Sequence, residues 1–288
     1  MAVSAKFSPP ARAIRAALPG LAVGDALGVP VEFSSRAARR RDPVLSMRAQ
    51  GTHNQPAGTW SDDAALAFCL AEALADGFSV AKVAENCGRW YYQNFWTPHG
   101  SVFDIGVTTR EALHRLKADP TLLLAGGKDE YSNGNGSLMR ILPLAFYRPA
   151  ELLASRFQLI FDVSAVTHGP VRAAVAGFLY LELARHLRAG LAPAAAYARL
   201  CQEAPAQLRQ LTIPAAEADQ FERILRGRLP DVPETAINSR GYVLHTLAAA
   251  LWCLLRCDSY AETVLAAVNL GDDTDTTGAV AGGLAGRA

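Results

Sequence analysis

The amino-acid sequence predicts an all-α fold of a single domain. Nearly every apolar segment repeats its hydrophobic residues with the period of a helix that is buried on one face. No stretch sustains the alternation of apolar and polar residues that is typical of a strand, and the chain has no internal repeat and no linker-like segment. With 288 residues, 50% of them hydrophobic, the chain is long enough to bury a large core.

The charge composition gives no reason to expect a nucleic acid or a membrane as partner. The 28 Lys and Arg residues nearly balance the 27 Asp and Glu residues, and the net charge is +1. The only basic run, Arg36 with 39–41, is interpreted as a solvated loop or helix end. The longest apolar run, 246–255, is too short to cross a bilayer, and charges and prolines interrupt the N-terminal segment where a signal peptide has its apolar core.

The five cysteines are interpreted as free thiols in a reducing compartment. They are odd in number and lie mostly in apolar helical contexts. Cys253 and Cys257 are one helical turn apart, but no further Cys or His stands nearby to complete a zinc site. We therefore expect a soluble cytoplasmic protein, and we expect it to be a monomer.

The helices are assigned from apolar periodicity together with their start and stop residues. Ser61 or Asp62 can cap the second helix, Pro98 follows the end of the third, and Asp104 can cap the fourth. A Gly- and Asn-rich loop at 126–136 precedes the fifth, and the later helices rest on apolar or alanine-rich periodicity. In chain order, the predicted helices span residues 11–28, 64–75, 80–95, 108–117, 138–146, 152–166, 172–188, 192–210, 241–255, 260–269 and 279–285.

The last predicted helix carries a stripe of glycines. Gly278, Gly282 and Gly286 recur at four-residue spacing, so they share one face. An interior glycine costs about 1 kcal/mol relative to alanine in a helix. The stripe therefore predicts that the backbone of a neighbouring element approaches this face closely.

Two acidic clusters, more than 200 residues apart, predict a cation site. The segment Gly271–Gly278 holds three carboxylates and three hydroxyls, and Ser61, Asp62 and Asp63 stand at a helix start. Two carboxylates 4 Å apart repel by about 4 kcal/mol at an effective dielectric of about 20, so the first cluster is either solvated or neutralised by a cation. Helix capping explains one or two residues of the second cluster but not all three. Together they offer an all-oxygen set that suits one or two Mg²⁺ or Mn²⁺ ions rather than zinc: Ser61, Asp62, Asp63, Asp273, Asp275 and Thr276.

From the residues alone, three further polar features can each be interpreted in two ways. Glu32, in an apolar setting, is either on the surface or has a partner. The segment 134–137 can bind an anion through backbone N–H groups, or it is an ordinary turn. His168, at a helix end, is either a cap or core histidine or a phosphate contact.

Seven motifs in this order resemble the ADP-ribosylglycohydrolase family, along nearly the whole chain. The resemblance implies one compact orthogonal helical bundle over residues 1–288, with two divalent ions at the base of a cleft. The chain stops at Ala288, before an aromatic-Gly segment and a last helix that family members usually have. The motifs are Gly24–Gly28 with Glu32, Ser61–Asp63, Phe103–Gly106, Gly134–Arg140, Thr167–His168, Gly241–Val243 and Gly271–Gly278.

The resemblance also implies a role for each matched residue. The six residues of the all-oxygen set match the ligands of two Mg²⁺ or Mn²⁺ ions, whereas Asp272 and Thr274 serve the loop. Asp62, Asp104 and Glu32 are the candidate catalytic carboxylates. The acid/base role falls to Asp62 or Asp104, with the choice between them open, and Glu32 matches an acidic residue beside the metals. The substrate-binding set is Asp104, Gly106, Gly134, Asn135, Gly136, Ser137, Met139, His168 and Tyr242.

The activity implied is metal-dependent removal of mono-ADP-ribose from a protein side chain, most often arginine, so the expected partners are ADP-ribose and an ADP-ribosylated protein. The alternatives are a hydrolase of another ADP-ribose conjugate, O-linked to Ser or Thr or on a small molecule, and a non-catalytic ADP-ribose-binding homologue. Retention of the four metal-site aspartates argues against the last. Val107 stands where many members have Asn, and Ala64 where a Thr commonly follows the paired aspartates. The first departure bears on substrate preference or rate.

Overall fold

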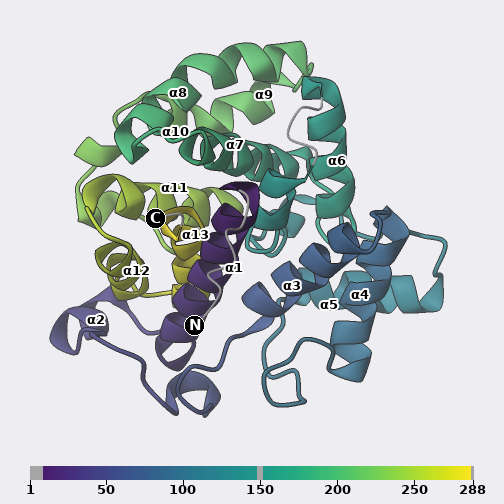
Figure 1. The fold of residues 1–288 in the computed structure, drawn as a ribbon, viewed down its shortest axis with the longest axis horizontal. Helices are drawn as coiled ribbons and strands as arrows, with labels where there is room; N and C mark the ends of the chain where they lie inside the picture. Colours follow the sequence, from purple (N-terminus) through teal and green to yellow (C-terminus); the bar gives the residue numbers. More distant parts are fainter. Residues whose placement is uncertain (1–8, 148–151, 287–288) are drawn as a thin grey trace, which may run out of the picture.

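The computed structural model describes residues 9–147 and 152–286, and this part of the chain is helical and contains no strand. The predicted all-α fold class is confirmed. The end of the chain at Ala288, where the resemblance implied a missing helix, lies outside the described residues. In chain order (Figure 1), the α-helices are α1 Pro9–Gly28, α2 Arg36–Arg41, α3 Asp62–Ala75, α4 Val80–Gln93, α5 Val107–Ala118, α6 Leu153–Ala165, α7 Val171–Arg188, α8 Pro193–Gln210, α9 Ala215–Ala218, α10 Glu222–Leu225, α11 Val243–Arg256, α12 Tyr260–Asn269 and α13 Thr274–Ala285.

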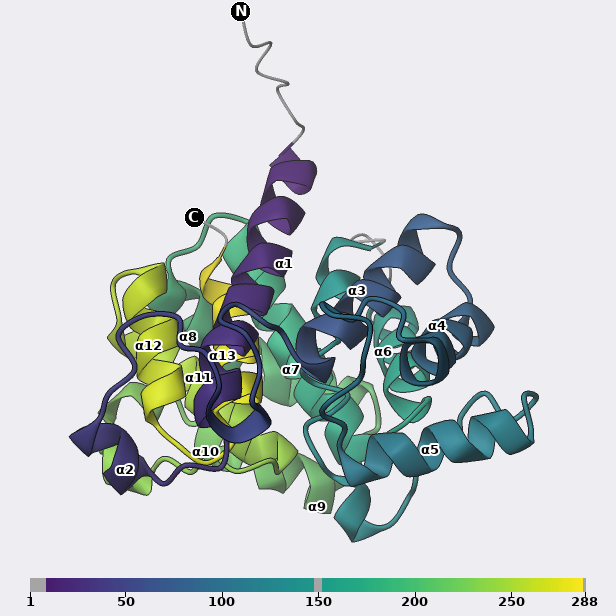
Figure 2. The same cartoon turned by 90° about the horizontal axis from the view of Figure 1, so that it is seen from below.

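The first and last helices, α1 and α13, pack along each other in the middle of the molecule (Figures 1 and 2). The contact is made by backbone. A Cβ added at Gly24 would lie 2.1 Å from the carbonyl oxygen of Gly278, and one at Gly282 would lie 2.3 Å from that of Gly20. The close approach predicted from the glycine stripe is confirmed, and α1 is the neighbour.

The hydrophobic core spreads from this pair through the other helices. One cluster of buried residues runs from Ala17 in α1 to Leu284 in α13. The middle of α7 is buried on nearly all sides, and the Tyr180 hydroxyl donates a hydrogen bond of 3.1 Å to the carbonyl of Val280 in α13. The bundle therefore holds α13, and the acidic residues at its start, from several directions.

One predicted α-helix is wrong, and the start of another is misplaced. Instead of an α-helix over 138–146, the structure has turns followed by a 3₁₀ helix at Leu142–Phe146. Pro143 explains the change, because it lacks an N–H donor and disfavours the α conformation of the preceding residue. The last helix begins at Thr274 rather than Ala279, so half of the predicted acidic loop is the first turn of α13.

The basic run is also less solvated than predicted. It forms the short helix α2, in which Arg39 is buried. The Arg36 guanidinium donates hydrogen bonds to the carbonyls of Leu270 at 2.8 Å and Ile237 at 2.7 Å. Arg36 thus joins α2 to the segment just before the acidic cluster.

The structure agrees with the interpretation of the cysteines as free thiols. The cysteines are free, and Cys69, Cys87 and Cys253 are buried, as predicted for thiols.

One window that the periodicity did not single out, Ile14–Val31, has the length and hydropathy of a membrane span. A core helix passes the same test, and 61% of this window is buried inside the fold.

The contact between α1 and α13 gives a first prediction. Gly24→Ala places a methyl group against backbone, so it should destabilise the protein by about 3 kcal/mol or more, the upper range for overpacking. A Cβ at Gly88, in the middle of α4, would meet no atom within 4 Å. Gly88→Ala should therefore stabilise the protein by up to about 1 kcal/mol. Denaturant unfolding of both variants measures the difference, and equal effects would contradict the close packing.

Candidate active site

A cleft of about 360 Å³ opens where the N-terminal ends of α3, α5 and α13 converge. Four carboxylates stand in its wall, and its lining contains neither Lys nor Arg. Most of the predicted site residues lie here. The lining residues are Glu32, Phe33, Asp62, Asp104, Ile105, Gly106, Val107, Thr108, Thr109, Gly134, Asn135, Gly136, Met139, His168, Gly241, Asp273 and Thr276.

The two acidic clusters predicted to form one site do meet. Asp62 and Asp63 form the first turn of α3, and Asp273 is the N-cap residue of α13. The Asp63 Oδ2 atom accepts hydrogen bonds from the hydroxyls of Ser61 at 3.1 Å and Thr276 at 3.3 Å, which joins the two helices. Both helices point the positive ends of their dipoles at this region, which favours anionic side chains there.

Asp25, in the middle of the first motif, is a site residue that sequence reasoning missed. Its carboxylate accepts hydrogen bonds from the backbone N–H of Ser61, at 2.9 and 3.0 Å to its two oxygens, and from that of Ala64 at 2.9 Å. Asp25 therefore caps α3 from the neighbouring helix α1. Its carboxylate also lies within 4.8 Å of those of Asp63 and Asp275. The available signal was a buried-looking Asp between two glycines.

The electrostatics of these carboxylates call for a counter-charge. Burial raises the pKa of Asp25 and of Glu32 to about 7. Burial, together with neighbouring carboxylates, raises the pKa values of Asp62, Asp63 and Asp275 well above their usual range. These shifts show that the fold disfavours several negative charges in this space unless a cation joins them.

The donor set fits such a cation. Three buried carboxylate oxygens have no hydrogen-bond partner among the described residues: Oδ1 of Asp63, Oδ1 of Asp273 and Oδ2 of Asp275. Ligand atoms of Glu32, Asp273 and Asp275 lie within 4.8 Å of one another. Oxygen ligands at this spacing are what Mg²⁺ and Mn²⁺ prefer, and bonds to an ion would satisfy the unpaired oxygens.

Glu32 and Asp104 share one side of the cleft with a histidine that the sequence did not single out. His53 donates or accepts a hydrogen bond through Nε2 with the Glu32 carboxylate. This contact raises the pKa of His53. Ligand atoms of Glu32, His53 and Asp104 lie within 4.8 Å of one another. Glu32 is therefore buried with a partner, which settles the ambiguity at that position.

The predicted phosphate loop forms another side of the cleft. The Asn135 side-chain amide donates hydrogen bonds of 2.8 Å to Thr246 Oγ1 and to Asp273 Oδ2, and its backbone N–H donates to the carbonyl of Gly241 at 3.0 Å. The amide hydrogens of Asn135 thus hold Asp273 in place rather than facing a ligand. A Cβ at Gly136 would lie 2.8 Å from the His168 ring, so this glycine lets the loop approach that histidine.

His168 lies at the floor of the cleft as a neutral group. Its Nδ1 shares a hydrogen bond of 2.8 Å with the Thr167 hydroxyl. Burial, together with the nearby Arg140 charge, lowers the pKa of His168 to about 3. His168 can therefore offer a substrate a hydrogen bond but not a positive charge at neutral pH.

Two members of the predicted substrate-binding set do not line the cleft. Ser137 is buried below it, and its hydroxyl has no partner among the described residues. Tyr242 caps α11, and its hydroxyl accepts a hydrogen bond of 3.0 Å from Arg172. Tyr242 still supports the cleft, because its backbone pairs with that of Gly134. A ligand role for its ring stays a prediction.

Asp272 and Thr274, expected to serve the loop, do not line the cleft, and Asp272 belongs to none of the carboxylate groups. The Thr274 hydroxyl donates a hydrogen bond of 2.8 Å to the carbonyl of Gly28 in α1. Asp272 has a left-handed backbone, with φ of 61°, and its N–H donates to the carbonyl of Ser34 at 2.8 Å. Both residues therefore position the start of α13.

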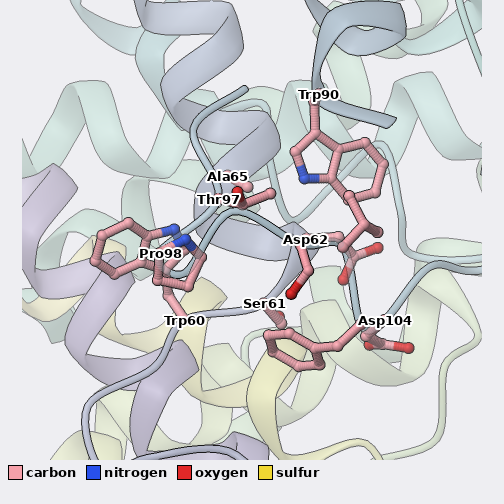
Figure 3. A pocket seen from close by; sticks show the side chains of 11 residues that line it. Trp60, Ser61, Asp62, Ala65, Trp90, Thr97, Pro98 and Asp104 are labelled. Carbon is pink, nitrogen blue, oxygen red and sulfur yellow. The ribbon is translucent and has the colours of Figure 1, made fainter. Parts of the chain in front are cut away.

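A second, smaller pocket adjoins the cleft. It shares Asp62 and Asp104 with the cleft, and Trp60 and Trp90 stand around it (Figure 3). Its volume of about 10 Å³ is the space of roughly one water molecule. A substrate group therefore enters through the cleft and not through this pocket.

Comparison with known proteins agrees with this geometry. A family model described as ADP-ribosylglycohydrolase matches residues 8–288. The chain belongs to the ADP-ribosylglycohydrolase family. The resemblance noted from the motifs, and the prediction that the protein is a hydrolytic enzyme, are thereby confirmed.

Named relatives and a solved structure support the assignment. ADP-ribosylarginine hydrolase Tri1 of Pseudomonas putida (strain GB-1) is 35% identical over 280 residues, which cover 94% of this chain and 69% of that protein. ADP-ribosyl-[dinitrogen reductase] glycohydrolase of Rhodospirillum rubrum is 28% identical over 274 residues, covering 93% and 82%. A solved structure, an ADP-ribosylglycohydrolase-related protein complex, is 34% identical with a TM-score of 0.74, covering 96% of this chain and 87% of that one.

The fit of a cation to the unpaired oxygens gives a second prediction. Saturating Mg²⁺ should stabilise the protein by about 2.7 kcal/mol at 100 times the dissociation constant and raise the melting temperature by about 5 °C. Asp275→Asn removes a ligand and a source of repulsion. It should melt at or above the parent in EDTA and gain little from Mg²⁺.

Thermal unfolding with Mg²⁺ and with EDTA measures both effects. Asp76→Asn is the matched control, because Asp76 is exposed at the other end of α3 and should leave the Mg²⁺ shift unchanged. An Asp275→Asn variant with the full Mg²⁺ shift would remove Asp275 from the cation site.

Proposed function

We propose that this protein is a divalent-metal-dependent hydrolase that cleaves the N-glycosidic bond between ADP-ribose and an arginine side chain. The observation that carries the proposal is the excess of carboxylates in a cleft whose lining has no Lys or Arg. Relatives 33–35% identical to the chain are named ADP-ribosylarginine hydrolases, which supports the same linkage.

The charge balance favours a substrate whose modified side chain is cationic. Seven carboxylates surround the site, and two divalent ions would supply four positive charges, so three negative charges remain if all seven are ionised. A guanidinium is attracted to this residual charge, whereas an O-linked serine or threonine is neutral. The seven residues are Asp25, Glu32, Asp62, Asp63, Asp104, Asp273 and Asp275.

The metal set that we propose is the all-oxygen set, Ser61, Asp62, Asp63, Asp273, Asp275 and Thr276, which would hold two Mg²⁺ or Mn²⁺ ions. Bound ions of this kind orient ribose hydroxyls and lower the pKa of bound water. The unpaired oxygens of Asp63, Asp273 and Asp275 support this assignment. Asp25, whose oxygens already accept backbone hydrogen bonds, acts as the support that holds Ser61 and Asp63 in place.

The leaving group determines what the protein has to do in catalysis. The bond between C1″ and the guanidinium nitrogen breaks with its electron pair going to nitrogen, so the positive charge moves to the ribose as an oxocarbenium-like ion. The guanidine leaves neutral and needs no prior protonation. Water then bonds to C1″ and loses a proton, and the guanidine finally takes up a proton.

Asp104 is the carboxylate that we propose as the base for this water. It is half-buried in the wall of the cleft, and burial raises its pKa, which makes the carboxylate a better proton acceptor. Asp62 is fully buried and belongs to the metal set. Glu32 is held by His53 and contributes negative charge opposite the developing oxocarbenium ion.

The other side of the cleft suits the anionic part of ADP-ribose. Because no Lys or Arg lines the cleft, we propose that the backbone N–H groups of Gly134 and Gly136, together with neutral His168, hold the diphosphate. The N–H of Asn135 is already bonded to the carbonyl of Gly241. The remainder of the substrate, an ADP-ribosylated protein, then extends from the carboxylate side. The cytoplasmic location and monomeric state stay predictions.

The third prediction tests the role of Asp104. Asp104→Asn should lower kcat for release of ADP-ribose from ADP-ribosylarginine in Mg²⁺ by a factor of about 10² to 10⁴, the usual contribution of a general base. Binding of ADP-ribose, followed by its effect on thermal unfolding, should be retained. Chromatographic detection of free ADP-ribose measures the rate, with Asp219→Asn, an exposed residue outside the cleft, as the control.

Two outcomes would contradict the proposal in different ways. A folded parent protein that binds ADP-ribose but releases none in Mg²⁺ or Mn²⁺ would be a binding homologue rather than a hydrolase. An active Asp104→Asn variant with unchanged kcat would assign the base to another carboxylate.

A further inference from the structure

Phe33 is a large apolar residue held in an unfavourable position. Its side chain is 69% exposed although it lines the cleft. Its backbone is left-handed, with φ of 61°, a conformation that is rare for a bulky residue. Neither its solvent exposure nor its backbone conformation favours a phenylalanine at this position. The ring therefore does not serve the stability of the fold, which indicates a role in binding.

The surrounding structure imposes this conformation. The Phe33 N–H donates a hydrogen bond of 2.7 Å to the carbonyl of Asp272, and the Asp272 N–H donates one of 2.8 Å to the carbonyl of Ser34. Asp272 is itself left-handed. Arg36, at the start of α2, donates a hydrogen bond to the carbonyl of Leu270 and so holds the segment after Phe33 in place. Phe33 is thus locked to the segment that leads into Asp273.

The ring lies at the carboxylate side of the cleft. Phe33 follows Glu32, whose carboxylate lies within 4.8 Å of those of Asp104, Asp273 and Asp275 in the clusters they form. The Phe33 ring centroid is 6.2 Å from that of His53, the hydrogen-bond partner of Glu32. An exposed aromatic face beside several carboxylates is the chemistry that binds a planar organic cation.

The small volume of the second pocket limits where such a cation can bind. That pocket, behind Asp62 and Asp104, has room for about one water molecule, so a guanidinium and its aliphatic chain cannot occupy it. The chain of the modified residue must leave through the open side of the cleft. Phe33 is an exposed aromatic residue in the cleft lining, on the carboxylate side.

We propose that Phe33 is the platform on which the guanidinium of the modified arginine stacks, and that it makes this cleft selective for an arginine linkage. This inference rests on the proposed function. The ring faces the positive charge of the substrate before the C1″–N bond breaks, and that charge moves to the ribose as the bond breaks. Phe33 therefore stabilises the bound substrate more than the transition state, so its loss should raise KM and should not lower kcat.

Steady-state kinetics with ADP-ribosylagmatine, a small guanidine conjugate, test the proposal. Phe33→Ala should raise KM by about tenfold, with kcat equal to or higher than that of the parent. Phe33→Tyr keeps an aromatic face and should stay within about threefold in KM. The affinity for ADP-ribose, which lacks the guanidine, should be unchanged in both variants. Leu45→Ala is the matched control, because Leu45 is 75% exposed but does not line the cleft.

A stability measurement separates this role from a structural one. Only glycine avoids the Cβ penalty at this backbone conformation, so Phe33→Gly should melt above Phe33→Ala while showing the same rise in KM. A structural role would instead make the two variants lose stability and activity together. Phe33→Ala melting above Phe33→Gly would contradict the strained placement of the ring.

Failure of the inference and failure of the proposed function give different results. An active parent with an unchanged KM in Phe33→Ala would overturn the role of Phe33 alone. An equal loss of ADP-ribose affinity would also overturn it, because the ring would then contact the ADP-ribose part of the substrate. A folded parent that turns over no ADP-ribosylagmatine would contradict the proposed function itself.

Discussion

The site depends on the direct backbone contact between α1 and α13. Because Gly24 and Gly278 have no side chains, the two helices approach far closer than side-chain packing allows. A Cβ at Gly28 would likewise lie 2.3 Å from the Cα atom of Asp275. This approach brings the end of the first helix beside the start of the last, so that Asp25 can cap α3 while Thr274 bonds to the carbonyl of Gly28. The carboxylates come together because α1 and α13 do.

The same contact gathers charges that the fold does not favour. Several carboxylates are buried with raised pKa values, and three of their oxygens have no partner among the described residues. Phe33 is a parallel case, since a bulky residue occupies a left-handed conformation with its ring exposed. A stable fold needs neither arrangement. Both make sense if a cation completes the acidic cluster and a substrate group covers the ring.

The sequence predicted the parts of the site that depend on local chemistry. The fold class follows from the 3.6-residue period, and the glycine stripe and the meeting of the two acidic clusters were predicted correctly. Asp25 and His53 were missed because neither belongs to a local cluster of acidic residues, and each acts through a tertiary contact, with Ser61 or Glu32, that no local pattern marks. The start of α13 was misplaced because Asp and Thr residues, poor in a helix interior, are favourable in a first turn.

We propose that the N-terminal ends of α3 and α13 hold divalent cations between them. Crystals grown with Mn²⁺, measured at the manganese absorption edge, test it directly, because the anomalous signal locates the metal without reference to activity. We expect anomalous peaks bounded by the carboxylates of Asp63, Asp273 and Asp275. Manganese found only elsewhere, with these carboxylates hydrogen-bonded to one another through shared protons, would contradict it.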